Sequence, residues 1–394
     1  MKDKLTILQR YSHMNKRPVV VWSLLAACLG LFMALPAKAA SLQLVTNNWG
    51  RTGVPSYINM YIYVPASVVT NPPILVACHY CSGNASDMFS LTSTGGIVAA
   101  CNQYGFIMIF PQTSQNCWDV GSSKSLSRYA GGDTQAIVNM VDYTVNTYQA
   151  NSNRVYVTGT SSGAMMTEAL LALYPDVFKA GAEFSGVPAG CWAVDYVSSD
   201  EWSSPCAEGQ VIYTPQAWAA IVRGMYQGYL GSRPRIQLWH GTADTIINYE
   251  NQNEAIKEWT DVLGLSTNAT LTTNLTYSSH QWTRQLWQDS CSNTLIDAWS
   301  EQNGPHMTDA DLNAQYVIPF LGLNEAGSND PAVPCVPPSP TLQVVGGNQV
   351  VLTWNWGTLL ETTNLPGPWT LISAPPCYTN IGTAPQQFFR VLNP

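Results

Sequence analysis

The stretch Val155–Pro175, VYVTGTSSGAMMTEALLALYP, places a serine between two glycines at the junction of two apolar segments. The first segment is typical of a buried strand and the second of a buried helix, which must end before Pro175. Because glycine has no Cβ, Gly159 and Gly163 allow a turn tight enough to bring strand and helix together. The pattern Gly-x-Ser-x-Gly in this context predicts a nucleophile elbow that presents the hydroxyl of Ser161 at the end of the strand.

Apolar runs of similar length recur along the chain and predict further strands: PPILVACHY, YGFIMIFPQ, KAGAEFSG and RPRIQLWHG. The segment GGDTQAIVNMVDYTVNTYQAN between two of them predicts a helix with Asp133 as its N-cap. One face of that helix carries Ile137, Met140, Val141, Thr144 and Tyr148. Buried strands joined by helices indicate a mainly parallel sheet, so the predicted fold class is α/β.

The first 39 residues combine basic side chains with the apolar run Val19–Leu35 and the small-residue pattern Ala37-Lys38-Ala39. This order is typical of a signal peptide that is removed after secretion. A membrane-spanning helix is the alternative, but Pro36 ends the run before the ~20 apolar residues that a span needs. We therefore expect residues 1–39 to direct the protein out of the cell and to leave no membrane attachment after cleavage.

A change of composition near residue 326 predicts a domain boundary. The segment GSNDPAVPCVPPSPT, which begins at Gly327, is too rich in proline for a helix or a central strand and is typical of a semi-rigid tether, so a linker is predicted over residues 326–340. Residues 341–394 then show short strand-like runs separated by turn residues. The chain is predicted to hold a large α/β domain over residues 42–325 and a small all-β module at its C-terminus.

The charge and the cysteine content restrict the partners and the compartment. Without residues 1–39, which hold six basic residues and one acid, eleven basic residues remain against 24 acidic ones. This balance argues against nucleic acid and anionic membranes and favours an uncharged polymer as the substrate. Ten cysteines suit an oxidising compartment. Cys78 and Cys81 form a single C-x-x-C pair with no second pair at a zinc-like spacing, so no metal or other cofactor is expected. The protein is also expected to be a monomer.

A serine hydroxyl needs a base to take its proton, and the base needs an acid to orient it. The strand, elbow and helix predict an α/β-hydrolase fold, in which the acid and then the histidine follow the serine along the chain. His280 and His306 are the histidines that come late enough. His280 lies in the strand-like TYSSHQWTRQLW, whereas His306 lies in the loop EQNGPHMTD after the strand-like TLIDAWS. We therefore predict His306 as the base.

The acid is predicted from its place relative to a strand. Asp244 follows the apolar run RIQLWHG directly, at the carboxyl edge where sites of α/β sheets assemble. Asp261, Asp289 and Asp297 also precede the histidine, but they fall in segments that read as helix, turn and strand. Asp244 is the predicted acid, and a turn-capping role is the alternative.

Ester cleavage also requires donors to the developing oxyanion. The N–H group that follows the nucleophile belongs to Ser162, and a second donor normally comes from the loop after an earlier strand. In LVACHYCSGNA this donor is expected to be the N–H of Cys81, with Tyr80 as the alternative.

These motifs resemble carbohydrate esterase family 1, and within it the secreted acetylxylan esterases related to feruloyl esterases and polyhydroxybutyrate depolymerases. The resemblance covers about residues 42–323 and is carried by HYCSGNA, QNCWDV, TGTSSGAMM, FSGVPAGCW and YLGSRPRIQLWHGTAD. It implies that Ser161, Asp244 and His306 form a catalytic triad. The histidine loop departs from the family, because GPHMTD stands where GHTVP-like surroundings are frequent.

The same resemblance implies two disulfides, Cys81 with Cys117 and Cys191 with Cys206. The remaining cysteines of the mature chain are not assigned by it: Cys78, Cys101, Cys291, Cys335 and Cys377. A bond between Cys78 and Cys101 is one conjecture for this group.

Three aromatic residues close to the site motifs are candidates for substrate binding, because their flat apolar faces suit sugar rings or aromatic acyl groups: Tyr80, Trp118 and Trp192. Packing in the core is the alternative for both tryptophans. The leading hypothesis is a secreted serine esterase that removes acetyl groups from xylan. Feruloyl esters or aliphatic polyesters such as polyhydroxybutyrate are alternative substrates, and a polysaccharide-binding protein with a vestigial esterase site is an alternative from another class.

Overall fold

The structure is a computed structural model, and it describes residues 40–194, 202–277, 279–306 and 313–332, followed by the C-terminal segments 341–346, 349–353, 358–364, 367–372, 377–381 and 386–392. The expected leader, residues 1–39, lies outside the described residues, and so do residues 333–340 of the expected tether. No helix in the described part is long and apolar enough to cross a membrane.

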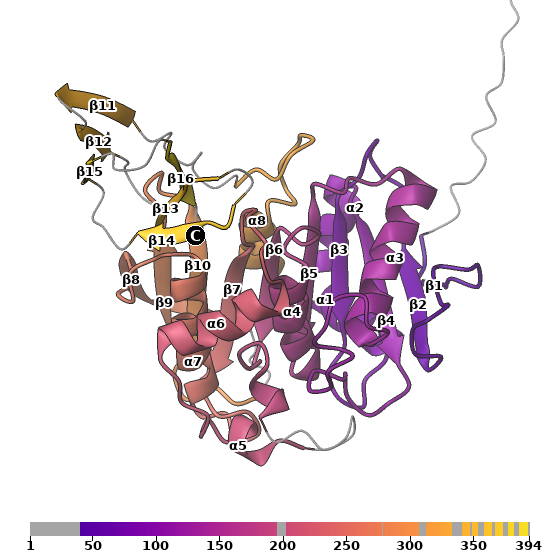
Figure 1. The fold of residues 1–394 in the computed structure, drawn as a ribbon. Coiled ribbons are helices and arrows are strands. Elements are labelled where there is room, and N and C mark those ends of the chain that lie inside the picture. Colours follow the sequence, from indigo (N-terminus) through magenta and orange to yellow (C-terminus); the bar gives the residue numbers. More distant parts are fainter. Residues whose placement is uncertain are drawn as a thin grey trace, which may run out of the picture. The chain divides into compact units, whose positions relative to one another are not determined.

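A ten-stranded sheet forms the centre of the large domain, in the order β1-β2-β4-β3-β5-β6-β7-β10-β9-β8 (Figure 1). Its central strands, β4 to β10 in this order, are all parallel, with antiparallel strands at both edges. Every predicted apolar run is one of the parallel strands, which confirms the α/β class. The strands are β1 (Gln43–Leu44), β2 (Ile58–Tyr63), β3 (Ile74–Cys78), β4 (Ile107–Thr113), β5 (Val155–Thr160), β6 (Ala180–Phe184), β7 (Arg235–Gly241), β8 (Leu271–Tyr277), β9 (His280–Gln288) and β10 (Thr294–Glu301).

Helices cover both faces of this sheet and create two hydrophobic cores. The larger core joins alternate strand residues, such as Val76 and Val157, to the helices α3 (Asp133–Tyr148), α4 (Ser162–Leu173), α6 (Pro215–Met225) and α7 (Glu250–Val262). The opposite face packs Leu75 and Tyr156 against α1 (Ala85–Thr94), α2 (Ile97–Tyr104) and α8 (Ala314–Leu321). Two short elements, a 3-10 helix (Cys191–Ala193) and α5 (Ser204–Ala207), lie between β6 and α6.

The predicted helix after residue 132 forms, but the predicted N-cap is wrong. Gly132 is the N-cap of α3, and Asp133 is already the first helical residue. The carboxylate of Asp133 instead accepts hydrogen bonds from the Asp119 N–H (3.1 Å) and the Tyr57 hydroxyl (2.9 Å). It therefore fastens a neighbouring loop to α3, a tertiary role that local sequence does not reveal.

The conjectured bond between Cys78 and Cys101 is also wrong, because both thiols are free and buried. Cys78 ends β3 and contributes to the larger core, whereas Cys101 on α2 contributes to the core on the opposite face. The sheet separates the two side chains. Cys291 is disulfide-bonded, and Cys335 lies outside the described residues.

The C-terminal region contains two antiparallel three-stranded sheets, as the prediction of an all-β module requires. One has the order β11-β12-β15 and the other β14-β13-β16. Leu352 and Leu359 are buried in a small core with Ile372, Tyr378 and Phe389 around them. The strands are β11 (Thr341–Gly346), β12 (Gln349–Thr353), β13 (Thr358–Thr362), β14 (Thr370–Ile372), β15 (Cys377–Ile381) and β16 (Phe388–Leu392).

Candidate active site

The turn between β5 and α4 has the geometry of a nucleophile elbow. Ser161 has φ 56° and ψ −119°, a conformation that L residues seldom adopt. Both neighbouring glycines are required by close backbone approaches. A Cβ on Gly159 would lie 2.2 Å from the Gly163 oxygen, and a Cβ on Gly163 would lie 2.2 Å from the Cys78 oxygen. The two glycines therefore let α4 pack directly against the ends of β5 and β3.

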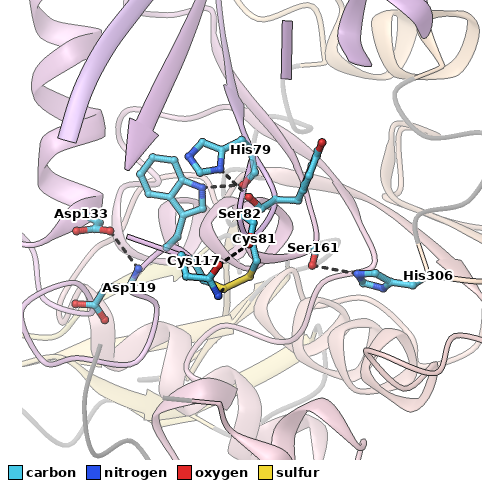
Figure 2. The surroundings of a disulfide bond; sticks show 11 residues. His79, Cys81, Ser82, Cys117, Asp119, Asp133, Ser161 and His306 are labelled. Carbon is cyan, nitrogen blue, oxygen red and sulfur yellow. Dashed lines mark hydrogen bonds between the residues drawn. A yellow bond between two sulfur atoms is a disulfide. The ribbon is translucent and has the colours of Figure 1, made fainter. Parts of the chain in front are cut away.

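The structure brings Ser161, Asp244 and His306 together in one hydrogen-bonded chain. The Nε2 atom of His306 lies 3.0 Å from the Ser161 Oγ, and its Nδ1 lies 2.7 Å from the Asp244 Oδ2. Figure 2 shows the imidazole directed at the serine hydroxyl. Since the carboxylate can only accept, the Nδ1–H donates to it, which leaves Nε2 to accept the serine proton.

Parallel strands place the acid and the histidine side by side. Asp244 follows β7 and His306 follows β10, and these strands are neighbours in the sheet. The Ala243 N–H donates to the Gly304 carbonyl across the two loops (2.9 Å). A Cβ on Gly241 would lie 2.3 Å from the Pro305 oxygen, so this glycine allows the histidine loop to approach the end of β7.

The carboxylate of Asp244 is buried and fully engaged. Its Oδ1 accepts from the Ile246 and Ile247 N–H groups at 2.8 and 2.9 Å, which are bonds of a local turn. Its Oδ2 faces two imidazoles, because the His240 Nε2 lies 3.2 Å away in addition to His306. Burial alone raises the pKa of Asp244, but the hydrogen bonds and charges of the two histidines outweigh it and hold that pKa well below its ordinary value. The carboxylate is thus ionised at any physiological pH.

The histidine and the aspartates that the sequence does not favour as base and acid lie elsewhere. His280 begins β9 and pairs with the buried Glu301, as expected for a sheet residue with a satisfied partner. Asp261 lies on α7 and pairs with Arg223. Asp297 lies in β10 and accepts from Arg284, while Asp289 lies in a turn.

The two predicted oxyanion donors lie beside Ser161. Cys81 and Ser162 line the same small hollow as Ser161. Neither of their N–H groups donates a hydrogen bond among the described residues. Cys81 is bonded to Cys117, and the Ser82 N–H donates to the Asn116 carbonyl (2.6 Å), so the donor loop is fixed by both a disulfide and a backbone bond (Figure 2).

The hollow has a volume of about 130 Å³, comparable with about four water molecules. Trp118 lines it but is only 2% exposed, and its indole N–H donates to the His79 carbonyl (2.8 Å). Trp192 lines it as well, next to the disulfide between Cys191 and Cys206. Tyr80 is not among the residues that line this hollow.

Three residues near the site escaped the sequence argument. Trp202 lines the hollow, is 50% exposed and packs edge-on against Trp192, with ring centroids 5.1 Å apart. Met165, one turn along α4 from the nucleophile, lines it too. His240 precedes Asp244 in the chain, so the expected order of serine, acid and histidine excludes it as the base. Its spacing of four residues from Asp244 is the one feature of the sequence that could have indicated a contact between the two.

A doubly covered parallel sheet, a nucleophile elbow and a Ser-His-Asp hydrogen-bonded chain at its carboxyl edge define an enzyme of the α/β-hydrolase fold.

Comparison with known proteins agrees with this class. The family model described as "Esterase PHB depolymerase" matches residues 56–211. Acetylxylan esterase A of Emericella nidulans is 42% identical over 245 residues, which cover 62% of this chain and 80% of that protein. Acetylxylan esterase A of Aspergillus ficuum is 42% identical over 255 residues, which cover 64% and 82%.

Among solved structures, the acetyl xylan esterase from Aspergillus awamori aligns with a TM-score of 0.66 and 37% identity, covering 72% of this chain and 99% of that one. The chain therefore belongs to the family that unites these acetylxylan esterases with the esterase PHB depolymerases, and it is a carboxylic ester hydrolase. This confirms the family that the motifs indicated.

Proposed function

We propose that this protein is a secreted acetylxylan esterase that works through a covalent acetyl-enzyme on Ser161. The observation that carries the proposal is the hydrogen-bonded chain from Asp244 through His306 to the serine hydroxyl. In the first step, His306 accepts the hydroxyl proton through Nε2 while the serine oxygen attacks the ester carbonyl carbon. Asp244 keeps the imidazole in the required tautomer and stabilises its positive charge.

The tetrahedral intermediate then carries a negative oxygen. Cys81 and Ser162 line the hollow beside Ser161, and their N–H groups, which donate no hydrogen bond among the described residues, would donate to this oxygen. His306 next gives its proton to the leaving sugar hydroxyl, which departs and leaves the acetyl-enzyme. A water molecule, deprotonated by the same imidazole, attacks the acyl carbonyl. The bond to the Ser161 oxygen then breaks, His306 returns the proton to that oxygen, and acetate is released.

The size of the hollow supports a small acyl group. A space of about 130 Å³ beside Ser161 suits a small acyl group such as acetyl. The exposed Trp202 and the neighbouring Trp192 would then offer an aromatic face to the sugar units of the polymer. Both matched relatives carry the name acetylxylan esterase, which supports the same choice.

A substrate panel tests this assignment. We expect the full-length protein to release acetate from acetylated xylan faster than it cleaves methyl ferulate or a polyhydroxybutyrate film. Faster cleavage of ferulate or of the polyester would move the assignment to one of those activities. Binding to xylan without cleavage of any of the three esters would support the vestigial-site alternative.

Secretion and domain organisation are part of the proposal. Disulfides at Cys81–Cys117 and Cys191–Cys206 suit an oxidising compartment outside the cytoplasm. Arg154 donates to the carbonyls of Gly322, Glu325 and Gly327, so the chain is still bound to the large domain there. We therefore place the start of the tether after residue 332, with the β module over residues 341–394 as an attachment to the polymer.

A further inference from the structure

His240 lies in the interior of the molecule, at the end of β7, and is completely buried. Its Nε2 lies 2.9 Å from the Ile247 carbonyl oxygen and 3.2 Å from the Asp244 Oδ2. Its Nδ1 has no hydrogen-bond partner within the part of the chain that the structure describes. A buried polar group carries a desolvation cost, so a histidine at this position needs a physical reason.

The surroundings of His240 assign its tautomer. A carbonyl oxygen and an ionised carboxylate can only accept, so the Nε2 atom that faces both must carry the proton. The Nε2–H is therefore directed to the Ile247 carbonyl oxygen, and the Asp244 Oδ2 lies 3.2 Å from the same nitrogen.

This arrangement gives the acid of the proposed triad a second imidazole donor. The Asp244 Oδ2 lies 3.2 Å from the His240 Nε2, and it accepts the Nδ1–H of His306. His240 is held by the parallel pairing of its strand with β10, whereas His306 comes from a loop. The fixed donor thus determines where the Oδ2 lies, and the Oδ2 in turn directs the imidazole that faces Ser161.

We propose that His240 is a positioning residue of the catalytic site, which holds the Asp244 carboxylate in the orientation that keeps His306 aimed at the serine. The proposal rests on the proposed function of the triad. It adds a role for a residue that touches neither the substrate nor the reacting atoms. Loss of a hydrogen bond to a charged group of this kind lowers an equilibrium or a rate by about 10-fold to 100-fold.

The other ionisable groups around the pair have partners of their own. Tyr249 packs edge-on against the His240 ring, with centroids 5.9 Å apart, and its hydroxyl is 2.8 Å from the Ser300 Oγ. Glu301 lies against the Gly304 turn and pairs with His280. These contacts make Tyr249→Phe a suitable control, because it removes a buried hydrogen bond close to His240 without touching Asp244.

Steady-state hydrolysis of 4-nitrophenyl acetate by the full-length protein is the first test of the proposal. We expect His240→Leu to lower kcat about 10-fold to 100-fold with KM changed by less than about 2-fold. His240→Gln, which can place an amide N–H near the same position, should recover most of the loss, and Tyr249→Phe should resemble the wild type. A role limited to filling the interior would not distinguish leucine from glutamine in this way.

A double-mutant cycle separates this inference from the proposed function. In an Asp244→Asn background, His240→Leu should change kcat by less than about 3-fold, because its effect passes through Asp244. An equal loss in both backgrounds, or a wild-type rate in His240→Leu, would overturn the proposal. Retained activity in Ser161→Ala would instead overturn the proposed function.

A measurement on the unaltered protein does not depend on whether the variants fold. Histidine-selective ¹⁵N labelling should show, for His240, a proton on Nε2. A ring protonated only at Nδ1 would contradict the assignment.

Discussion

Gly163 lies so close to Cys78 that a Cβ on the glycine would be 2.2 Å from the cysteine's carbonyl oxygen. This close approach joins the first turn of α4 to the end of β3. The Cys78 oxygen belongs to the backbone of a central strand, so it cannot move aside for a side chain at residue 163. The position of the Ser161 hydroxyl relative to the Cys81 loop therefore depends on the absence of a side chain at residue 163.

We expect Gly163→Ala to lower the free energy of unfolding by about 1–3 kcal/mol, as overpacked core substitutions do. Esterase activity should fall with it, because the elbow must shift. Gly224→Ala is the matched control, since that glycine lies in α6 with nothing within 4 Å of the added Cβ. The control should be stabilised by about 0.5–1 kcal/mol in urea unfolding. Equal stability of both variants would contradict the packing argument.

The disulfide between Cys81 and Cys117 is predicted to support catalysis as well as stability. It holds the loop that carries the second oxyanion donor, and the loss of one such donor costs about 10²–10³ in kcat. Cys117→Ser leaves the donor present but less fixed, so we expect a loss in kcat of about 10-fold and little change in KM for 4-nitrophenyl acetate. Unchanged kcat in a variant that loses thermal stability would limit the disulfide to a structural role.

We predict that the exposed rim of the hollow binds the polymer and takes no part in the cleavage of the ester bond. Trp202 is 50% exposed and packs on Trp192 beyond the nucleophile. We expect Trp202→Ala to raise KM for acetylated xylan about 3-fold to 10-fold, as the loss of an aromatic contact does, with little effect on 4-nitrophenyl acetate. Tyr129→Ala, at a side chain that is 58% exposed and does not line the hollow, is the control. An equal effect on both substrates would refute a polymer-binding role.

Three buried glutamates predict a loss of stability at alkaline pH. Glu168, Glu183 and Glu258 are at most 1% exposed, and Glu168 and Glu258 accept hydrogen bonds from Trp259 Nε1 and the Ala189 N–H, respectively. Burial raises the pKa of Glu183 to about 8, and burial with the neighbouring carboxyl groups raises the other two. A carboxyl group whose pKa is raised by folding contributes fully to stability below its pKa in the unfolded chain, which is near 4.5. This contribution is lost as the pH rises through the pKa in the folded protein, about 8 for Glu183.

Urea unfolding at pH 5 and pH 9 measures this effect. The free energy of unfolding should be lower at pH 9, and Glu183→Gln should reduce the difference between the two pH values. Glu208→Gln removes an exposed carboxyl group and should leave the difference unchanged. A protein that is equally stable at both pH values would show that the buried carboxyl groups are not protonated at pH 5 in the way proposed.

The elements that the sequence predicted well are those in which local pattern and tertiary environment agree. The apolar runs around Val76 and Val157 are buried on both faces of the sheet, so their continuous hydrophobicity was an unambiguous signal. The elbow was recognisable because its glycines are required by backbone contacts near Ser161. The choice of Asp244 and His306 followed from their places after strands, which become neighbours in the parallel sheet.

Two of the failures share one cause, which is that the relation depends on the tertiary fold. Asp133 binds Asp119 and Tyr57 across the fold, so its position before a helix suggested a cap that it does not form. Cys78 and Cys101 lie on opposite faces of the sheet, a relation that cysteine counting cannot reveal. Trp202 and His240 were missed for another reason. Their partners, Trp192 and Asp244, lie only ten and four residues away, but no known motif contains either pair.

The most direct test of the account is to locate the acetyl group during turnover. The full-length protein, mixed with 4-nitrophenyl acetate and quenched in acid within milliseconds, should carry one acetyl group on the peptide that contains Ser161. The same peptide should remain unmodified in the Ser161→Ala protein, and His306→Ala should acquire the group far more slowly. An acetyl group on another residue, or full esterase activity in Ser161→Ala, would contradict the mechanism.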